Sequence, residues 1–207
     1  MRYCCALVLC AVTACASKGS EAAEQADTTG RRDSIAAVAA ASMNEAQVLG
    51  LLEHVHLTDG QLGALGGQGG STLDMRNFGL MIQREHQALE RDVREVAEGL
   101  RLTAQRPSVA PDEAPPTFRA NVDSSPAGVP WDLAYVEYTI AAHEASLENT
   151  ARALAATKSP AVREYIRKSI PILQKHLDKA HSLQQTLVKA QPARTSTSPS
   201  PSPTPQR

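Results

Sequence analysis

The sequence predicts an all-α protein that folds as a four-helix bundle. Alanine and leucine dominate the apolar residues, which make up 42% of the 207 residues, and both favour helices. Apolar residues also recur at intervals of three and four in separate segments between residues 42 and 191. The length suits one domain of ordinary size, so we expect a single helical domain over residues 42–191.

The first two helices are predicted to begin at residues 42 and 74. Ser42 and Glu45 have the spacing of a capping box at the start of the first helix. Its apolar seam is Val48, Leu51, Val55, Leu62 and Leu65. Glycines crowd residues 60–70, and each costs a helix about 1 kcal/mol relative to alanine, so we expect this half of the helix to fray. The second helix extends to about residue 101 along Phe78, Ile82, Leu89, Val93, Val96 and Leu100.

The third and fourth helices are predicted on either side of Ser159-Pro160, which has the pattern of an N-cap followed by the first helical residue. The third begins near Trp131-Asp132 and carries Leu133, Val136, Ile140, Leu147, Ala151 and Leu154. The fourth spans residues 160–190 along Ile166, Ile170, Leu173, Leu177, Ala180 and Leu187. Pro171 lies inside it, and we expect a kink there because proline removes a backbone donor.

The connections between the helices predict their topology. Short turns join the first helix to the second and the third to the fourth, which makes two antiparallel hairpins. The link between the second and third helices takes residues 102–130 and contains six prolines. It is long enough to run the length of a helix, and one long crossover between two hairpins is the ferritin-like connectivity. A simple up-down-up-down bundle with a long loop is the alternative.

The N-terminus has the pattern of a bacterial lipoprotein signal peptide, predicted over residues 1–14. A short positive start precedes an apolar run over residues 3–12, which is too short to span a bilayer. The run ends in Val12-Thr13-Ala14-Cys15, which resembles a lipobox, so Cys15 is predicted to be lipidated. The alternative is an ordinary secreted protein cleaved near Ala14 or Ala16. Residues 15–41 would be a flexible tether, and the Pro/Ser/Thr-rich residues 192–207 a disordered tail.

These segments predict where the protein works and exclude several functions. We expect an exported protein on the periplasmic side of the envelope, and on the outer membrane because no aspartate follows Cys15. All four cysteines lie within residues 1–15, which excludes a disulfide framework and a cysteine-ligated metal in the domain. A net charge of −1 and seven aromatic residues disfavour nucleic acid as a partner. No glycine loop follows a strand, so we expect no nucleotide.

Three histidines interrupt the apolar seams, each near the middle of its predicted helix: His86, His143 and His176. Antiparallel packing would place them at one level, with His56 and Asp59 of the first helix close by. Glu85 and Glu144 neighbour two of them in sequence. Imidazoles and carboxylates that converge in a bundle are ligands for a transition-metal ion such as Zn, Cu, Ni or Fe, with the remaining polar groups in an outer layer.

The alternative is that these histidines bind no ligand and are hydrogen-bonded within the protein interior. Buried polar groups normally find partners, here Glu85, Glu144, Asp132 or a tyrosine hydroxyl such as that of Tyr135. A ferritin-type di-iron centre is disfavoured because Glu-x-x-His is absent: Gln83, Ile140 and Leu173 precede the three histidines by three residues. Haem is disfavoured because the chain has no Cys-x-x-Cys-His and few aromatic residues.

Three segments of this sequence stand out together: the stretch to Glu85-His86 with Phe78, the run Trp131-Asp132-Leu133-Ala134-Tyr135 followed by His143, and Ile170-Pro171-Ile172-Leu173 followed by His176-Leu177 and Ala180. Over about residues 43–187 they resemble the segments of a bacterial family, domain of unknown function 4142 (DUF4142). Gly66 and Gly70 depart from the alanines usual in the family, and Asp59 stands where a glutamate is common. The resemblance implies a ferritin-like bundle in an exported or lipidated protein, and it marks the three histidines without giving them a role.

Two hypotheses of function follow from the sequence. The first is a non-enzymatic envelope lipoprotein that is held on the membrane by its lipid and binds an envelope protein or a small ligand. The alternative is a metal-binding or metal-dependent redox bundle that uses the histidine level.

Overall fold

The computed structural model describes residues 43–107 and 111–191, which contain five helices and no strand. The helices are α2 (Glu45–Gly69), α3 (Leu73–Gly99), α4 (Pro116–Ser124), α5 (Val129–Ala156) and α6 (Pro160–Ala190). The all-α class is confirmed. The predicted signal peptide, Cys15, the tether and the C-terminal tail lie outside the described residues.

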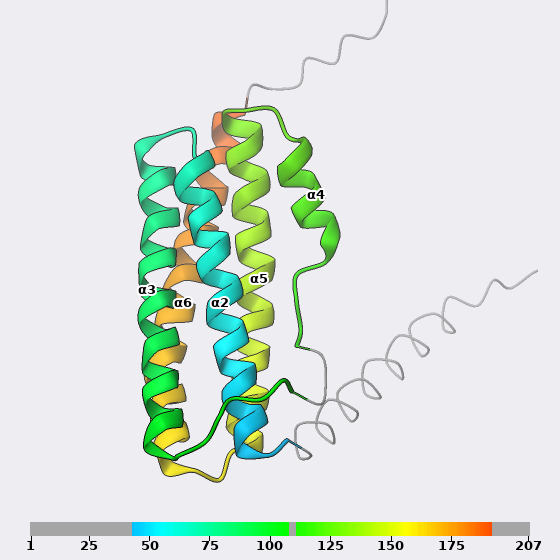
Figure 1. Cartoon of the computed structure of the whole chain (residues 1–207). Coiled ribbons are helices and arrows are strands. Elements are labelled where there is room, and N and C mark those ends of the chain that lie inside the picture. The colour runs from blue at the N-terminus through cyan, green and yellow to red at the C-terminus, as the bar shows by residue number, and fades with distance from the viewer. Residues whose placement is uncertain (1–42, 108–110, 192–207) are drawn as a thin grey trace, which may run out of the picture. The chain divides into compact units, whose positions relative to one another are not determined.

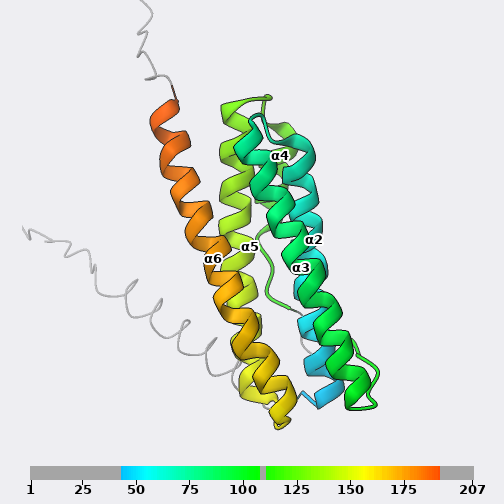
Figure 2. The ribbon, with the colours of Figure 1, turned by 90° about the vertical axis from the view of Figure 1, so that its left-hand side faces the viewer.

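The four long helices pack side by side (Figures 1 and 2). Two hairpins, α2–α3 and α5–α6, lie against each other, with α2 in contact with α5 and α3 in contact with α6. The connection after α3 carries the chain back along the helices to the opposite end, where α5 begins (Figure 1). None of the helices in the described ranges is both long and apolar enough to cross a membrane.

The first described helix begins later than predicted. Its N-cap is Asn44, whose side chain accepts a hydrogen bond from the backbone N–H of Gln47 at 2.9 Å, while Gln47 bonds back to Asn44 N. The predicted box of Ser42 and Glu45 is therefore wrong. The Glu45 carboxylate instead accepts bonds from Thr157 and the backbone of the next two residues, so it ties the α5–α6 turn to the start of α2.

The expected fraying of the glycine-rich half of α2 is also wrong. The helix continues to Gly69, and its glycines lie where neighbouring elements come too close for a side chain. A Cβ at Gly63 would lie 2.4 Å from the backbone nitrogen of Gln83, and one at Gly66 would lie 2.2 Å from the Tyr135 ring. The tight packing of α2 against α3 and α5 compensates for the low helix propensity of glycine.

The crossover contains a helix that the sequence analysis did not predict. α4 packs against α5, and its Val122 is 1% exposed within an apolar cluster. α5 begins at Val129, two residues before the predicted start, after Gly128 with a φ of 98°. The predicted bounds of α6 and its Ser159 cap are confirmed, and the helix continues through Pro171. The kink at Pro171 stays a prediction.

The interior contains two apolar clusters separated by polar side chains. On α3, His86 lies between Ile82 of one cluster and Leu89 of the other. Each of the other three long helices likewise has a buried histidine between its residues of the two clusters. We call the buried groups at this level the polar layer: His56, Asp59, His86, His143, Ser146 and His176. Burying so many polar groups costs free energy unless they bond to one another or to a ligand.

Candidate metal centre

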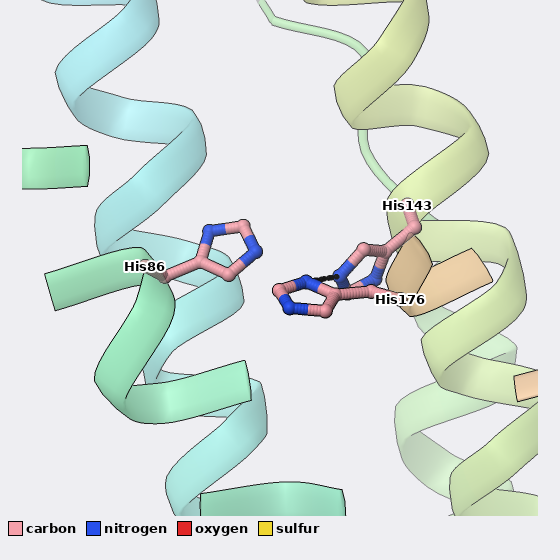
Figure 3. A group of neighbouring side chains, drawn as sticks. All are labelled: His86, His143 and His176. Carbon is pink, nitrogen blue, oxygen red and sulfur yellow. Dashed lines mark hydrogen bonds between the residues drawn. The ribbon is translucent and has the colours of Figure 1, made fainter. Parts of the chain in front are cut away.

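Three helices bring one histidine each to the same point inside the protein. His86 of α3, His143 of α5 and His176 of α6 are fully buried, and one ring nitrogen of each lies within 4.8 Å of those of the other two. We call these three residues the histidine cluster. Figure 3 shows the ring of His86 reaching from one side toward the adjacent rings of His143 and His176. These residues meet because each occupies a seam position at mid-helix.

Two of these rings are held with their remote nitrogens in hydrogen bonds. His143 Nδ1 donates to the carbonyl oxygen of Thr139 at 2.9 Å, and His176 Nε2 donates to a carboxylate oxygen of Glu85 at 2.8 Å. In neutral rings these bonds leave the lone pairs on His143 Nε2 and His176 Nδ1. These two nitrogens lie 3.3 Å apart in the interior (Figure 3). With both outer nitrogens donating, neither neutral ring has a second N–H to place between them.

The third ring, His86, has its own outer partners. His86 Nδ1 lies 3.3 Å from His56 Nδ1 and 3.8 Å from Asp59 Oδ2, which accepts a hydrogen bond of 2.7 Å from Ser146. His86 Nε2 is buried and has no hydrogen-bond partner among the described residues. When His86 Nδ1 carries the proton and faces His56 and Asp59, the lone pair is on His86 Nε2 and no protein group donates to it among the described residues.

Burial makes the charged forms of these rings unfavourable. It lowers the pKa of His56 to about 3 and that of His176 to about 4, and the neighbouring His143 adds to both effects. Burial also holds the pKa of His86 well below its ordinary value. The dry interior therefore favours the neutral forms of His56, His86 and His176.

The two carboxyl groups beside the layer differ in environment. Burial raises the pKa of Asp59. Burial would also raise the pKa of Glu85, but hydrogen bonds from Lys175 and His176 outweigh it and lower that pKa. Glu85 therefore holds negative charge directly behind His176, at the edge of the protein.

The structure brings together most, but not all, of the predicted site residues. His56 and Asp59 join the polar layer as expected, whereas Glu85 lies behind His176 and bonds to its remote nitrogen. Glu144 is exposed and outside the histidine cluster, because a residue adjacent to His143 on a helix faces about 100° away.

Asp132 and Tyr135 lie at the end of α5 away from the polar layer. Asp132 accepts bonds from the backbone N–H and the hydroxyl of Ser71, so it fixes the α2–α3 turn. The Tyr135 ring stacks on Trp131 with ring centroids 5.4 Å apart. Neither residue bonds to a histidine, so their expected role in an outer layer around the histidines is not supported.

The sequence analysis missed three residues that bond within or beside this layer: Thr139, Ser146 and Lys175. Thr139 lies four residues before His143 and Ser146 lies three after it, so all three share one face of α5. Their spacing in the sequence could have predicted that Thr139 and Ser146 lie beside His143. Lys175 is the third. Its ammonium contacts both oxygens of Glu85, at 2.7 and 2.5 Å, a pairing between helices that spacing along one helix does not reveal.

Comparison with known proteins identifies one family. The model of the domain of unknown function DUF4142 matches residues 30–183. No curated protein and no solved structure matches the chain.

Proposed function

This chain belongs to the DUF4142 family, and from that premise and the polar layer we propose that it binds one transition-metal ion through His86, His143 and His176. The ligand atoms would be His86 Nε2, His143 Nε2 and His176 Nδ1. The proposed function is metal binding, in place of the binding of an envelope protein or a small ligand. The observation that carries it is the 3.3 Å separation of His143 Nε2 and His176 Nδ1, in two rings whose other nitrogens bond to Thr139 and Glu85.

The distance between these nitrogens suits a metal. Two nitrogens bound to one four-coordinate ion at about 2.0–2.1 Å lie about 3.3–3.4 Å apart, because the tetrahedral angle fixes that separation. His143 Nε2 and His176 Nδ1 already have this spacing, and a ring nitrogen of His86 lies within 4.8 Å of one on each of the other two histidines. Imidazole ligands suit Zn, Cu, Ni or Fe, and disfavour Mg and Ca.

The groups behind the ligands support the same proposal. A metal-bound histidine usually donates its other N–H to a carboxylate or a carbonyl, which fixes the tautomer. Glu85 does this for His176 and Thr139 for His143, while His56 and Asp59 lie behind His86. Glu85 and Asp59 also supply two carboxyl groups that would balance the charge of a divalent ion in the interior.

We further propose the setting of this site. The domain would be a ferritin-like four-helix bundle on the outer membrane, exported by the signal peptide of residues 1–14 and held by lipid on Cys15. Support comes from the lipobox-like Val12-Thr13-Ala14-Cys15 and from the crossover that separates two antiparallel hairpins. Mass spectrometry of the membrane fraction tests the anchor: Cys15→Ser should abolish a lipid-modified N-terminus.

Metal content tests the site itself. The full chain, purified without an affinity tag and supplemented with Zn, Cu, Ni or Fe, should retain about one equivalent of one ion after desalting, since three preset imidazoles favour binding. The same ion at one hundred times its Kd should stabilise the fold by about 2.7 kcal/mol and raise the Tm by about 5–10 °C. Elemental analysis and thermal melts give both numbers.

His143→Leu separates a metal site from structural histidines. In chelator this change should alter the free energy of unfolding by less than about 1 kcal/mol, since leucine replaces a buried polar group of similar size. In metal-supplemented buffer it should abolish both the bound ion and the rise in Tm. His181→Leu, an exposed histidine on α6, is the control and should retain both. Less than about 0.1 equivalent of every ion in the unsubstituted chain would contradict the proposal.

A further inference from the structure

The buried polar layer approaches the outside of the protein on three sides among the described residues, two of them through carboxyl groups. On one side Glu85, with a side chain 31% exposed, bonds to His176 and pairs with Lys175. On a second side Asp59 lines a pocket between α2, α5 and the crossover. On the third side His56 lines a pocket between α2 and α3, together with Gln61, Gln83 and Glu90. A cation that reaches the histidine cluster past a carboxyl group of the layer uses one of the first two sides.

The pocket beside Asp59 has a volume of about 110 Å³ and a polar lining. α2 supplies one wall, α5 the opposite wall, and crossover residues 112–114 lie over it. The polar groups in the lining include His54, Thr58, Asp59, Asp112, Glu113 and Ser146. Asp112 is paired with Arg152 at 2.9 Å, so the carboxyl groups of Asp59 and Glu113 are the ones left to attract a cation.

The inner end of the pocket adjoins the site. Asp59 is 2% exposed, and its Oδ2 both accepts the hydrogen bond from Ser146 and lies 3.8 Å from His86 Nδ1. A cation at Asp59 would therefore be one side chain away from the histidine cluster. The Asp59 carboxyl is the last oxygen donor on that path.

The outer end is closed by the crossover at defined points. The backbone of Asp112 exchanges two hydrogen bonds with the Asn149 side chain, at 2.9 and 2.8 Å, and Glu113 bonds to His54 at 3.1 Å. These contacts involve exposed or partly buried groups, so they open at lower cost than the apolar core. The Glu113 carboxylate stays 65% exposed, at the mouth of the pocket.

The opposite side is unsuited to entry. The ammonium of Lys175 contacts both oxygens of Glu85, and it places a positive charge in front of the carboxylate. Glu85 also bonds to the remote nitrogen of His176, which faces away from the convergent lone pairs. A cation arriving there would meet the repulsion of the Lys175 ammonium.

We propose that the pocket beneath crossover residues 112–114 is the passage by which a divalent transition-metal ion enters and leaves the histidine cluster, with Asp59 as the inner donor and Glu113 at the mouth. This rests on the proposed function. The passage would assign a role to two residues that are not metal ligands. Changes in the passage would then alter the rates of binding and release without altering the Kd.

Stopped-flow transfer of the retained ion, whether Zn²⁺, Cu²⁺, Ni²⁺ or Fe²⁺, from a coloured chelator to the full chain tests the route. Glu113→Gln should slow association about threefold at low salt, because it removes an attracting charge from the mouth. Ala114→Phe, which fills the pocket from the crossover, should slow association and dissociation equally, by about tenfold, with Kd unchanged. Glu148→Gln, a change at an exposed carboxylate of α5 outside the pocket, should alter neither rate.

Lys175→Met distinguishes the two sides. The proposal expects an unchanged association rate, whereas entry past Glu85 would be faster without the repelling ammonium. Faster binding in Lys175→Met together with normal rates in Glu113→Gln and Ala114→Phe would overturn the route and leave the metal site intact. A chain that takes up no ion at all would instead contradict the proposed function.

Discussion

Replacing Gly79 with alanine is expected to lower the free energy of unfolding by about 3 kcal/mol or more, which corresponds to a fall in Tm of about 6–12 °C. A Cβ at this position would lie 2.3 Å from the backbone nitrogen of Gly67 and 2.7 Å from the carbonyl oxygen of Gly63. Both neighbours are backbone atoms, so no side chain can turn away. α2 and α3 must separate, and their shared apolar contacts are lost together.

Gly99→Ala is the matched control on the same helix. No heavy atom lies within 4 Å of a Cβ built on Gly99, so alanine should be neutral or stabilise the protein by up to about 1 kcal/mol through its better helix propensity. Urea unfolding followed by circular dichroism measures both variants. Equal stability of Gly79→Ala and the unsubstituted chain would show that α2 and α3 are not packed this closely.

The glycines show what sequence periodicity along one helix cannot reveal. Propensity alone predicts that residues 60–70 fray, because each glycine weakens an isolated helix. The compensation comes from α3 and α5, where Gln83, Gly79 and Tyr135 lie in the space that side chains would fill. The close approach of these glycines to residues of other helices is a tertiary contact. It cannot be predicted from the composition of residues 60–70 alone.

The apolar seams did predict the long helices and the level of the site. Seam positions fix which side of a helix faces the interior, and equal distances from the hairpin turns bring His86, His143 and His176 together. Short links also predicted the two hairpins. α4 was missed because its nine residues lie in a proline-rich link, and it is stabilised by contact with α5 through residues such as Val122.

The partners of the histidines were harder to predict than their positions. Glu144 and Glu85 each adjoin a histidine in sequence, but only Glu85 bonds to one, and that one is His176 on another helix. The choice depends on the rotation of α3 and α6 about their axes, which sets whether a flanking residue lies at the edge of the interface or in solvent. Tautomers follow from these contacts, so they could not be inferred from spacing.

Lowering the pH from 7 to 5 is expected to reduce the free energy of unfolding of the metal-free protein by about 4 kcal/mol. Burial lowers the pKa of His56 to about 3, that of His176 to about 4, and that of His86 well below its ordinary value. The folded protein therefore keeps these rings neutral at pH 5, whereas the unfolded chain protonates them near pH 6.5. The raised pKa of Asp59 offsets at most one of these three protons, which leaves a net uptake of at least two on unfolding.

The sign of this effect follows from which state binds more protons. The stability contributed by the three neutral rings is fully present above about pH 6.5 and is lost as the pH falls from there toward about 4, because these rings gain protons in the unfolded chain and not in the folded one. Chemical unfolding in chelator at half-unit steps of pH measures the slope, which should be about 1.4 kcal/mol per pH unit for each proton. His56→Gln should reduce the slope by about one proton, and the exposed His181→Gln should leave it unchanged. A flat profile between pH 7 and 5 would mean that the rings accept protons within the fold, and two facing lone pairs would then no longer require a metal.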